Sequence, residues 1–317
     1  MASWIALAVV FLSVSQTISS GLKPPAVKPV RRFAARAGLP PSYADAALAR
    51  RLYGDESTAA GASAFLILAT LAVGLTVPAL RENDQWAVTL VAAYLLGRTV
   101  GAVVPVVRAT VARADDAPRV ARPFMPSVTD YVSPLARWAA LASGLLPAAC
   151  VGLIALFLGT DLVDASQANW PLMAAGAVVG PVVTGGAAVL AARFTAAPRR
   201  AAAPHELAAD DAVRAYRVRA LLSAATGVSA MAATTVMGAA TAMPTGTTAQ
   251  NPAGVLFMGA MFAAALVYAA ASIAVDLVGS GRRYRARLWP QGLPQGPAPE
   301  GGADGADRAD GADGGAR

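Results

Sequence analysis

The chain has 317 residues, of which 56% are apolar and only 14% are charged. Soluble domains carry about 25% charged residues, so this composition argues against a water-soluble fold and indicates an integral membrane protein. The formal net charge of +7 does not indicate nucleic-acid binding, because the basic residues stand in blocks between long apolar runs. A single cysteine and a single histidine exclude an internal disulfide, a thiolate metal site and a His-rich metal site.

Apolar runs of the length of a membrane span recur along the whole sequence. A helix needs about 20 apolar residues to cross a hydrocarbon core about 30 Å thick. We therefore predict an all-α fold, a polytopic transmembrane helix bundle with seven spans. The alternative is six spans plus a peripheral N-terminal helix, because the first run is short and ends in Ser and Thr. The runs are 2–20, 59–80, 86–107, 135–159, 171–192, 220–241 and 254–278.

The charge of the connections alternates along the chain. The short connections 81–85, 160–170 and 242–253 are neutral or acidic. Together they contain one basic residue, Arg81, and the acidic residues Glu82, Asp84, Asp161 and Asp164. Because basic loops stay in the cytoplasm, we expect the N-terminus outside and the C-terminus inside. Arg-rich, Lys-poor and Ala-rich usage favours a bacterial plasma membrane. The segments that hold nearly all the Arg residues are 22–58, 108–134, 193–219 and 279–317.

The first apolar run lacks the charged start of a secretory signal peptide, since residues 1–4 carry no charged side chain. Its cleavage would also place the Arg-rich segment 22–58 outside and invert every later loop against the charge rule. We therefore expect residues 1–21 to remain as the first span.

The expected domain organisation follows from these runs. Residues 22–58 form a basic cytoplasmic segment with a short helix over 42–53, where Ser42 and Asp45 have the spacing of a capping box. Residues 59–279 form a six-span bundle of three helical hairpins. Residues 280–317 are expected to be a disordered cytoplasmic tail, because large apolar residues end at Leu293.

A second short helix is expected over 205–222, before the sixth span. Asp210 and Arg214 stand there at the (i, i+4) spacing of a helical ion pair. The carboxylates of Glu206, Asp210 and Asp211 lie near the lone His205. On a short basic piece without a pocket they are interpreted as solvated charges at the start of a helix.

Three charged residues lie within apolar runs, and one of them, Arg137, stands at the cytoplasmic end of its run and needs no special role. Arg98 is near the middle of the third run and Asp276 near the inner end of the last one. Intramembrane charges usually face a bundle interior or a cavity, so Arg98 is a candidate for an anion site or pathway. The alternative is a structural Arg98 that reaches back to the cytoplasmic side. Depth counting predicts an Arg98–Asp276 pair, which would reduce the cost of burying both charges.

Helix-breaking residues stand midway in the fourth and fifth runs. Pro147 and the Gly180-Pro181 pair are candidate breaks, and paired broken helices are typical of transporter sites. The alternative is a packing kink, which neighbouring helices tolerate in membranes. Gly97 with Gly101, and Gly176 with Gly180, have the GxxxG spacing of close helix contacts.

The sixth run is rich in hydroxyl groups. Their interpretation is hydrogen bonding back to the helix, with lining of a cavity as the alternative. The residues are Ser223, Thr226, Ser229, Thr234, Thr235 and Thr241.

No catalytic, cofactor-binding or metal motif is recognisable, so we do not expect an enzyme or a cofactor. The expected function is a non-enzymatic membrane component, either a scaffold or an assembly or helper subunit. The alternative is a small-solute transporter or channel with a site near Arg98 and the broken fourth and fifth spans. The expected partners are the lipid bilayer and a second membrane protein or a second copy of the chain, and not nucleic acid. A polar cavity reaching Arg98 would favour transport, and an interior filled by Ala and Gly would favour the scaffold.

Overall fold

The computed structural model describes residues 27–76, 86–111, 125–158, 169–197, 201, 203–241, 266, 270, 273 and 282–294. Within these ranges the secondary structure is helical and contains no strand, which confirms the predicted all-α class. The elements are α2 (Val27–Ala37), the 3-10 helix η1 (Pro41–Tyr43), α3 (Ala46–Thr76), α5 (Trp86–Val111), α6 (Val128–Tyr131), α7 (Pro134–Leu158), α8 (Trp170–Ala196), α9 (Pro204–Thr241) and α11 (Arg282–Leu288).

Among the described residues, five helices are long and apolar enough to cross a membrane: α3, α5, α7, α8 and α9. The seven-span count is not confirmed. The expected first span, 2–20, lies outside the described residues. So does most of the expected last span, of which Leu266, Ala270 and Ile273 are described as helical and exposed.

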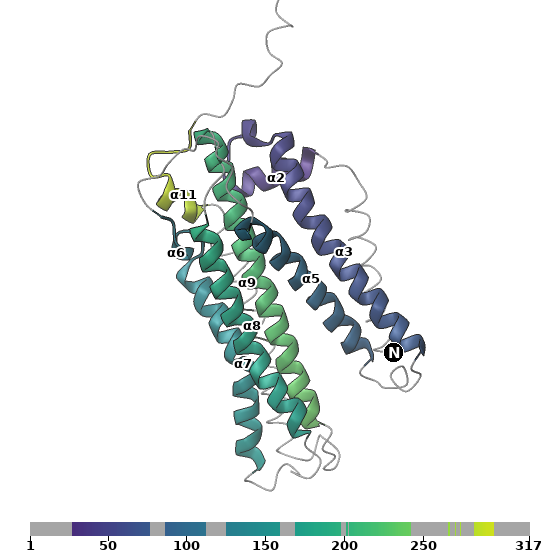
Figure 1. Cartoon of the computed structure of the whole chain (residues 1–317). Helices are drawn as coiled ribbons and strands as arrows, with labels where there is room; N and C mark the ends of the chain where they lie inside the picture. Colours follow the sequence, from purple (N-terminus) through teal and green to yellow (C-terminus); the bar gives the residue numbers. More distant parts are fainter. Residues whose placement is uncertain are drawn as a thin grey trace, which may run out of the picture.

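The long helices form two groups. Helix α3 packs on α5, while α7, α8 and α9 pack on one another. Contacts between α5 and α9 join the two groups, which lie close at the end where α2, α6 and α11 gather and diverge toward the other end (Figure 1). Two of the three expected helical hairpins are therefore visible, as α3 with α5 and α7 with α8.

Helices α3 and α9 are longer than their apolar runs. The expected short helix over 42–53 and the second span form one helix of 31 residues, and the expected helix over 205–222 and the sixth span form one of 38 residues. The Asp45 carboxylate accepts a hydrogen bond from the Leu48 N–H at 2.7 Å, so the capping oxygen is that of Asp45. At about 1.5 Å per residue, α9 is about 57 Å long and extends far beyond a bilayer core.

The candidate breaks at Pro147, Gly180 and Pro181 do not interrupt the helices. Helix α7 continues through Pro147, and α8 continues through Gly180 and Pro181. The physical reason is packing, because a Cβ on Gly180 would overlap the Gly144 carbonyl oxygen and approach the Pro147 ring. The proline ring of α7 therefore fits the notch that Gly180 leaves on α8, and neighbouring helices stabilise both proline turns.

The first GxxxG motif is the contact between α3 and α5. A Cβ on Gly97 would overlap the backbone of Ser63, and a Cβ on Gly101 would overlap Ala59. Ala59 and Ser63 are themselves four residues apart, so two rows of small residues face each other. The predicted close helix approach is confirmed for this motif.

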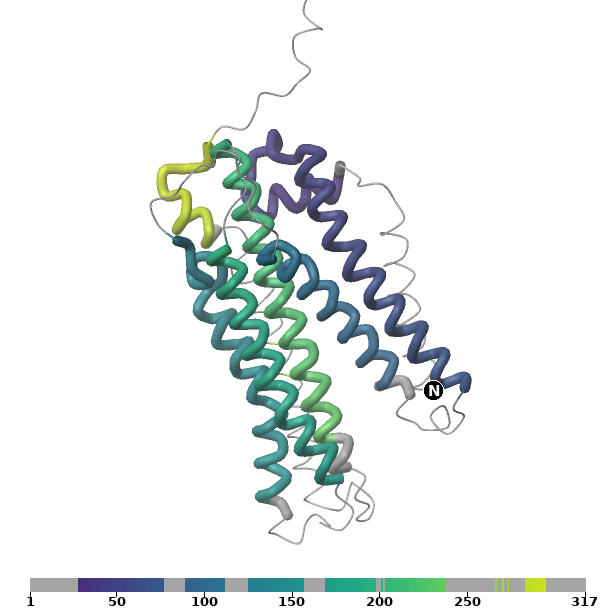
Figure 2. Tube along the Cα trace, viewed as in Figure 1, coloured from purple at the N-terminus to yellow at the C-terminus, as the bar shows by residue number. Residues whose placement is uncertain are grey.

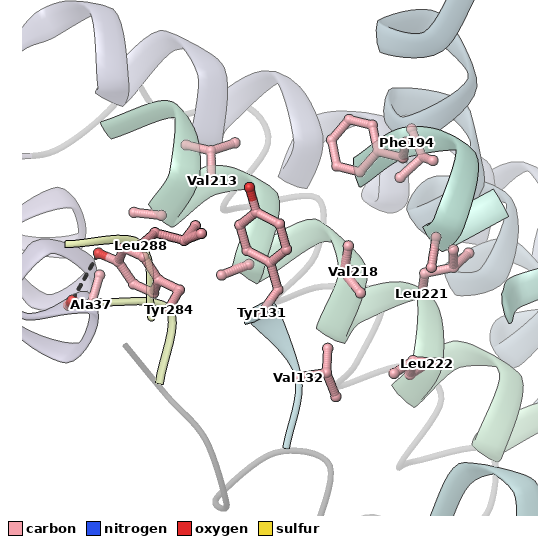
Figure 3. Packing of buried hydrophobic residues seen from close by; sticks show 14 of the residues in the cluster. Ala37, Tyr131, Val132, Phe194, Val213, Val218, Leu221, Leu222, Tyr284 and Leu288 are labelled. Carbon is pink, nitrogen blue, oxygen red and sulfur yellow. Dashed lines mark hydrogen bonds between the residues drawn. The ribbon is translucent and has the colours of Figure 1, made fainter. Parts of the chain in front are cut away.

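Short elements cover the N-terminal ends of α3 and α9. We call residues 27–45, 125–133 and 282–294 the cap. Figure 3 shows Tyr131, Tyr284 and Leu288 of the cap meeting Val213 and Val218 of α9 in one hydrophobic cluster. The expectation of a disordered tail over 280–317 is wrong for 282–294, because contacts with distant segments stabilise a helix that its local composition did not predict. The residues after 294 lie outside the described part.

Candidate functional site

Two charged side chains are buried among the described residues, and both belong to α9. Asp211 is 0% exposed and Arg214 is 6% exposed. Burying a charge is costly unless it is paired and hydrogen-bonded, so the partners of these two groups define their role. They lie where the N-terminal part of α9 passes under the cap.

The Asp211 carboxylate joins three separate segments. It accepts a hydrogen bond from the Tyr131 hydroxyl of α6 at 3.0 Å and one from the Trp289 indole N–H, which follows α11, also at 3.0 Å. The expectation that Asp211 is a solvated helix-start charge is therefore wrong. Asp211 is buried because α6 and the segment after α11, both distant in the sequence, cover this face of α9.

Arg214 closes the C-terminal end of α8. Its Nε donates to Asp210 at 2.8 Å, which confirms the predicted (i, i+4) pair. Its Nη1 donates to the carbonyl oxygens of Phe194 at 2.8 Å and Ala197 at 3.1 Å. The last carbonyl groups of a helix lack partners within the helix, and a guanidinium there satisfies them and complements the helix dipole.

Arg217 connects the two helix groups. Its Nε and one terminal nitrogen bind the two oxygens of Asp55 on α3 at 2.7 and 2.9 Å. The side chains are 18% and 12% exposed, so this two-pronged pair is shielded from water. The pair between Arg51 and Asp210, at 3.7 Å with Arg51 48% exposed, contributes much less.

Two tyrosine hydroxyls fasten the C-terminal part of the cap to its N-terminal part. Tyr284 donates to the Ala37 carbonyl oxygen at 3.0 Å, the bond drawn in Figure 3, and Tyr43 donates to that of Pro294 at 2.6 Å. Burial raises the pKa of Tyr284 well above its ordinary value and also raises the pKa of Tyr43. Both hydroxyls therefore keep their protons and stay donors at neutral pH.

The interior between α7, α8 and α9 is polar but closely packed. Ser143 donates to Thr226 at 3.3 Å, and the hydroxyls of Thr184 and Ser229 lie 3.3 Å apart. All four side chains are buried. A Cβ on Gly144 would come within 2.5 Å of the Thr184 hydroxyl oxygen, so little free space remains at this level.

Two further hydroxyls of α9 bond within the helix. Thr234 and Thr235 donate to the Met231 carbonyl oxygen at 2.8 and 2.9 Å. The predicted back-bonding is thus confirmed for these two residues, whereas Thr226 and Ser229 link helices instead.

Arg98 lies apart from this interior, exposed on α5. Three residues further, Gly101 meets Ala59, where the apolar run of α3 begins. Arg98 is thus about 4.5 Å along α5 from the start of the apolar run of α3. It lies nearer the cap end of the bundle than the middle position that the sequence predicted. A long arginine side chain reaches the bilayer edge from there. Asp276 lies outside the described residues, and the Arg98–Asp276 pair stays a prediction.

Sequence reasoning missed Asp211, Tyr131 and Trp289 as a cluster. The hydrogen-bonded partners stand 80 and 78 residues away from Asp211 along the chain, and no local pattern joins them. One signal was available on α9 itself. Asp211 is four residues after Leu207 and seven before Val218, so it belongs to the apolar helical stripe that faces inward.

Comparisons with known proteins do not add to this picture. The chain matches no known protein family, no curated protein and no solved structure. In the ranges that the structure describes, no group of three or more His, Cys, Asp or Glu residues is placed to hold a metal ion. The function is therefore argued from the contacts above.

Proposed function

We propose that the chain is a non-enzymatic membrane component that acts as a scaffold or an assembly subunit. The observation that carries this proposal is the use of the buried charges. Asp211 and Arg214 hold separate segments of the chain together through the hydrogen bonds described above. Groups committed in this way stabilise a shape, whereas catalytic groups are directed toward a substrate.

Packing between α7, α8 and α9 supports the scaffold over the transporter. A binding site for a small solute needs a cavity between the helices. Here a Cβ on Gly176 would approach Val236, and Gly180 faces Gly144 and Pro147 with no room for a side chain. The transporter alternative retains one supporting observation, the exposed charge of Arg98 on a membrane-crossing helix.

The proposal includes a bacterial plasma membrane with the cap in the cytoplasm and the N-terminus outside. In support, the cap and the N-terminal end of α9, both rich in Arg, lie at one end of the bundle (Figure 1). Helix α9 ends at Thr241 away from the cap, whereas α11 belongs to the cap. The chain therefore passes from one end of the bundle to the other between Thr241 and Arg282, which supports a sixth crossing in addition to the five described helices. The proposed seventh span, 2–20, lies outside the described residues.

Native assembly size tests the scaffold proposal. After crosslinking in the membrane of the cells that make it and extraction in a mild detergent, we expect a species larger than one 31.9 kDa chain with its detergent belt. Light scattering coupled to size exclusion measures the protein mass, and mass spectrometry gives a fixed stoichiometry with a second membrane protein or a second copy. Arg98→Gln should leave this mass unchanged.

An anion-transport assay tests the alternative function. Proteoliposomes of the purified chain that swell in an iso-osmotic anion solution, and lose this swelling with Arg98→Gln, would establish transport. A protein mass of one chain together with that result would overturn the scaffold proposal. A set of chloride, phosphate and small carboxylate salts covers the anions that an arginine site would accept.

Cysteine accessibility tests the orientation. Cys150 is buried and is the only cysteine, so Cys150→Ser provides a background without a reactive thiol. Arg287→Cys, at an exposed position of α11, should react with a membrane-impermeant maleimide only after the cells are permeabilised. Asn169→Cys, at an exposed position in the connection before α8 at the opposite end of the bundle, should react in intact cells. The reverse pattern would invert the orientation.

A further inference from the structure

Helix α2 has one basic and one apolar face. Its apolar side is buried in the cap, with Val30, Ala34 and Ala37 between 2% and 7% exposed. Because that side is already covered, α2 cannot insert it into a bilayer as a free amphipathic helix would. The face that remains exposed carries four cations: Lys28, Arg31, Arg32 and Arg36.

Among the described residues, these cations have no acidic partner. Helix α2 contains no acidic residue. In the part of the chain that the structure describes, none of the four cations of α2 forms an ion pair, in contrast to Arg51, Arg214 and Arg217. Lys28, Arg31 and Arg32 instead line one shallow open hollow together with Ala35. Guanidinium groups bind phosphate through paired N–H donors, so an exposed row of these cations on one helix face suits an anionic partner.

The depth of α2 matches the lipid headgroups. The Phe33 ring meets the Tyr216 ring edge to face, with 5.7 Å between centroids. Tyr216 precedes the apolar run that begins at Ala220 by four residues, or about 6 Å of helix. The polar layer on each side of the hydrocarbon core is about as thick as this distance. In Figure 2 the tube of α2 runs across the direction of α3, so its face extends along the membrane surface.

We propose that the exposed face of α2 binds anionic phospholipid headgroups of the adjoining leaflet. Lys28, Arg31 and Arg32 supply three positive charges on this face, and Arg36 adds charge one helical turn further along. Charge is the only means of attachment, because the apolar face is occupied. The position of α2 at the level of the headgroups favours lipid as the partner. An acidic soluble protein could bind a basic face at any distance from the membrane. This inference does not depend on the scaffold role.

Lipid titration of the full chain tests it. Dioleoylphosphatidylglycerol is added to the protein in a nonionic detergent, and native mass spectrometry measures the fraction bound, with dioleoylphosphatidylcholine for comparison. Each basic residue near an anionic surface is worth a factor of about 5 in affinity, so Arg31→Gln with Arg32→Gln should weaken phosphatidylglycerol binding about 25-fold. Arg31→Lys with Arg32→Lys keeps the charge and should stay within about threefold of the wild type.

A matched control removes the same charge elsewhere. Arg50→Gln with Arg287→Gln also deletes two exposed cations of this end of the molecule and should leave binding unchanged. An equal loss in this control, or equal binding of both lipids, would show that α2 has no site. Displacement of the lipid by equimolar inorganic phosphate would assign a soluble anion, and displacement by an equimolar polyglutamate peptide would assign an acidic protein. Either result would overturn the proposal. Circular dichroism verifies that every variant retains its helix content.

Discussion

Gly101→Leu should lower the free energy of unfolding by about 3 kcal/mol or more and separate α3 from α5. A Cβ at this position would overlap the Cα and Cβ of Ala59, so the obstacle is another backbone and cannot rotate away. The helices would have to move apart along their whole contact, which includes Gly97 against Ser63. Close packing is the main attraction between membrane helices, and a wider separation removes it.

Unfolding in mixed detergent micelles measures this effect, with increasing sodium dodecyl sulfate as the denaturant and circular dichroism as the signal. Gly61→Leu is the matched control on α3, because Gly61 is exposed and no atom lies within 4 Å of its Cβ position. The control should unfold at least as late as the wild type, since leucine favours helix over glycine. Equal midpoints for the two variants would show that α3 and α5 are not in close contact.

Asp211→Ala should release α11 and α6 from α9 at a cost of roughly 2–4 kcal/mol. The substitution removes the carboxylate that accepts from the Tyr131 hydroxyl and the Trp289 indole N–H, and Tyr131 is 1% exposed. Removing one partner of a buried hydrogen bond costs about 1–3 kcal/mol. The sign is unambiguous, because alanine supplies neither an acceptor nor the volume of the carboxylate.

Limited trypsin digestion reports on this release. The Arg residues of α11 should be cleaved much faster in Asp211→Ala than in the wild type, and Trp289 fluorescence should shift to longer wavelength as its indole becomes hydrated. Glu56→Ala removes an exposed carboxylate from α3 and should change the unfolding free energy by less than about 0.5 kcal/mol. A wild-type cleavage rate in Asp211→Ala would show that other contacts hold α11 in place.

Much of the candidate site was beyond local sequence patterns. The Asp210–Arg214 pair was predictable, because a helix places residues four apart on one side. The same reasoning missed that Arg214 also caps α8, since its other acceptors, Phe194 and Ala197, lie across a connection between helices. It also treated Asp211 as solvated, because the segments that cover it are distant in the chain.

The proline positions illustrate a related limit. Pro147 and Pro181 weaken a helix taken alone, so breaks were a reasonable prediction from the sequence. Helices α7 and α8 continue through both, because neighbours pack against the proline turns and the Pro147 ring fits beside Gly180. The helix-breaking preference of proline and the packing of neighbouring helices oppose each other at these positions, and the packing determines the conformation.

The amino-acid sequence by itself determined that the chain is helical, that long parts of it suit a membrane and that its Arg-rich segments alternate with acidic or neutral ones. Hydropathy and charge are sums over neighbouring residues, so short windows of sequence contain them. Only the tertiary structure decided that α11 is ordered and that Asp211 is buried, because each depends on which distant residues lie opposite. The same holds for the pairing of Arg217 with Asp55, whose partners stand 162 residues apart.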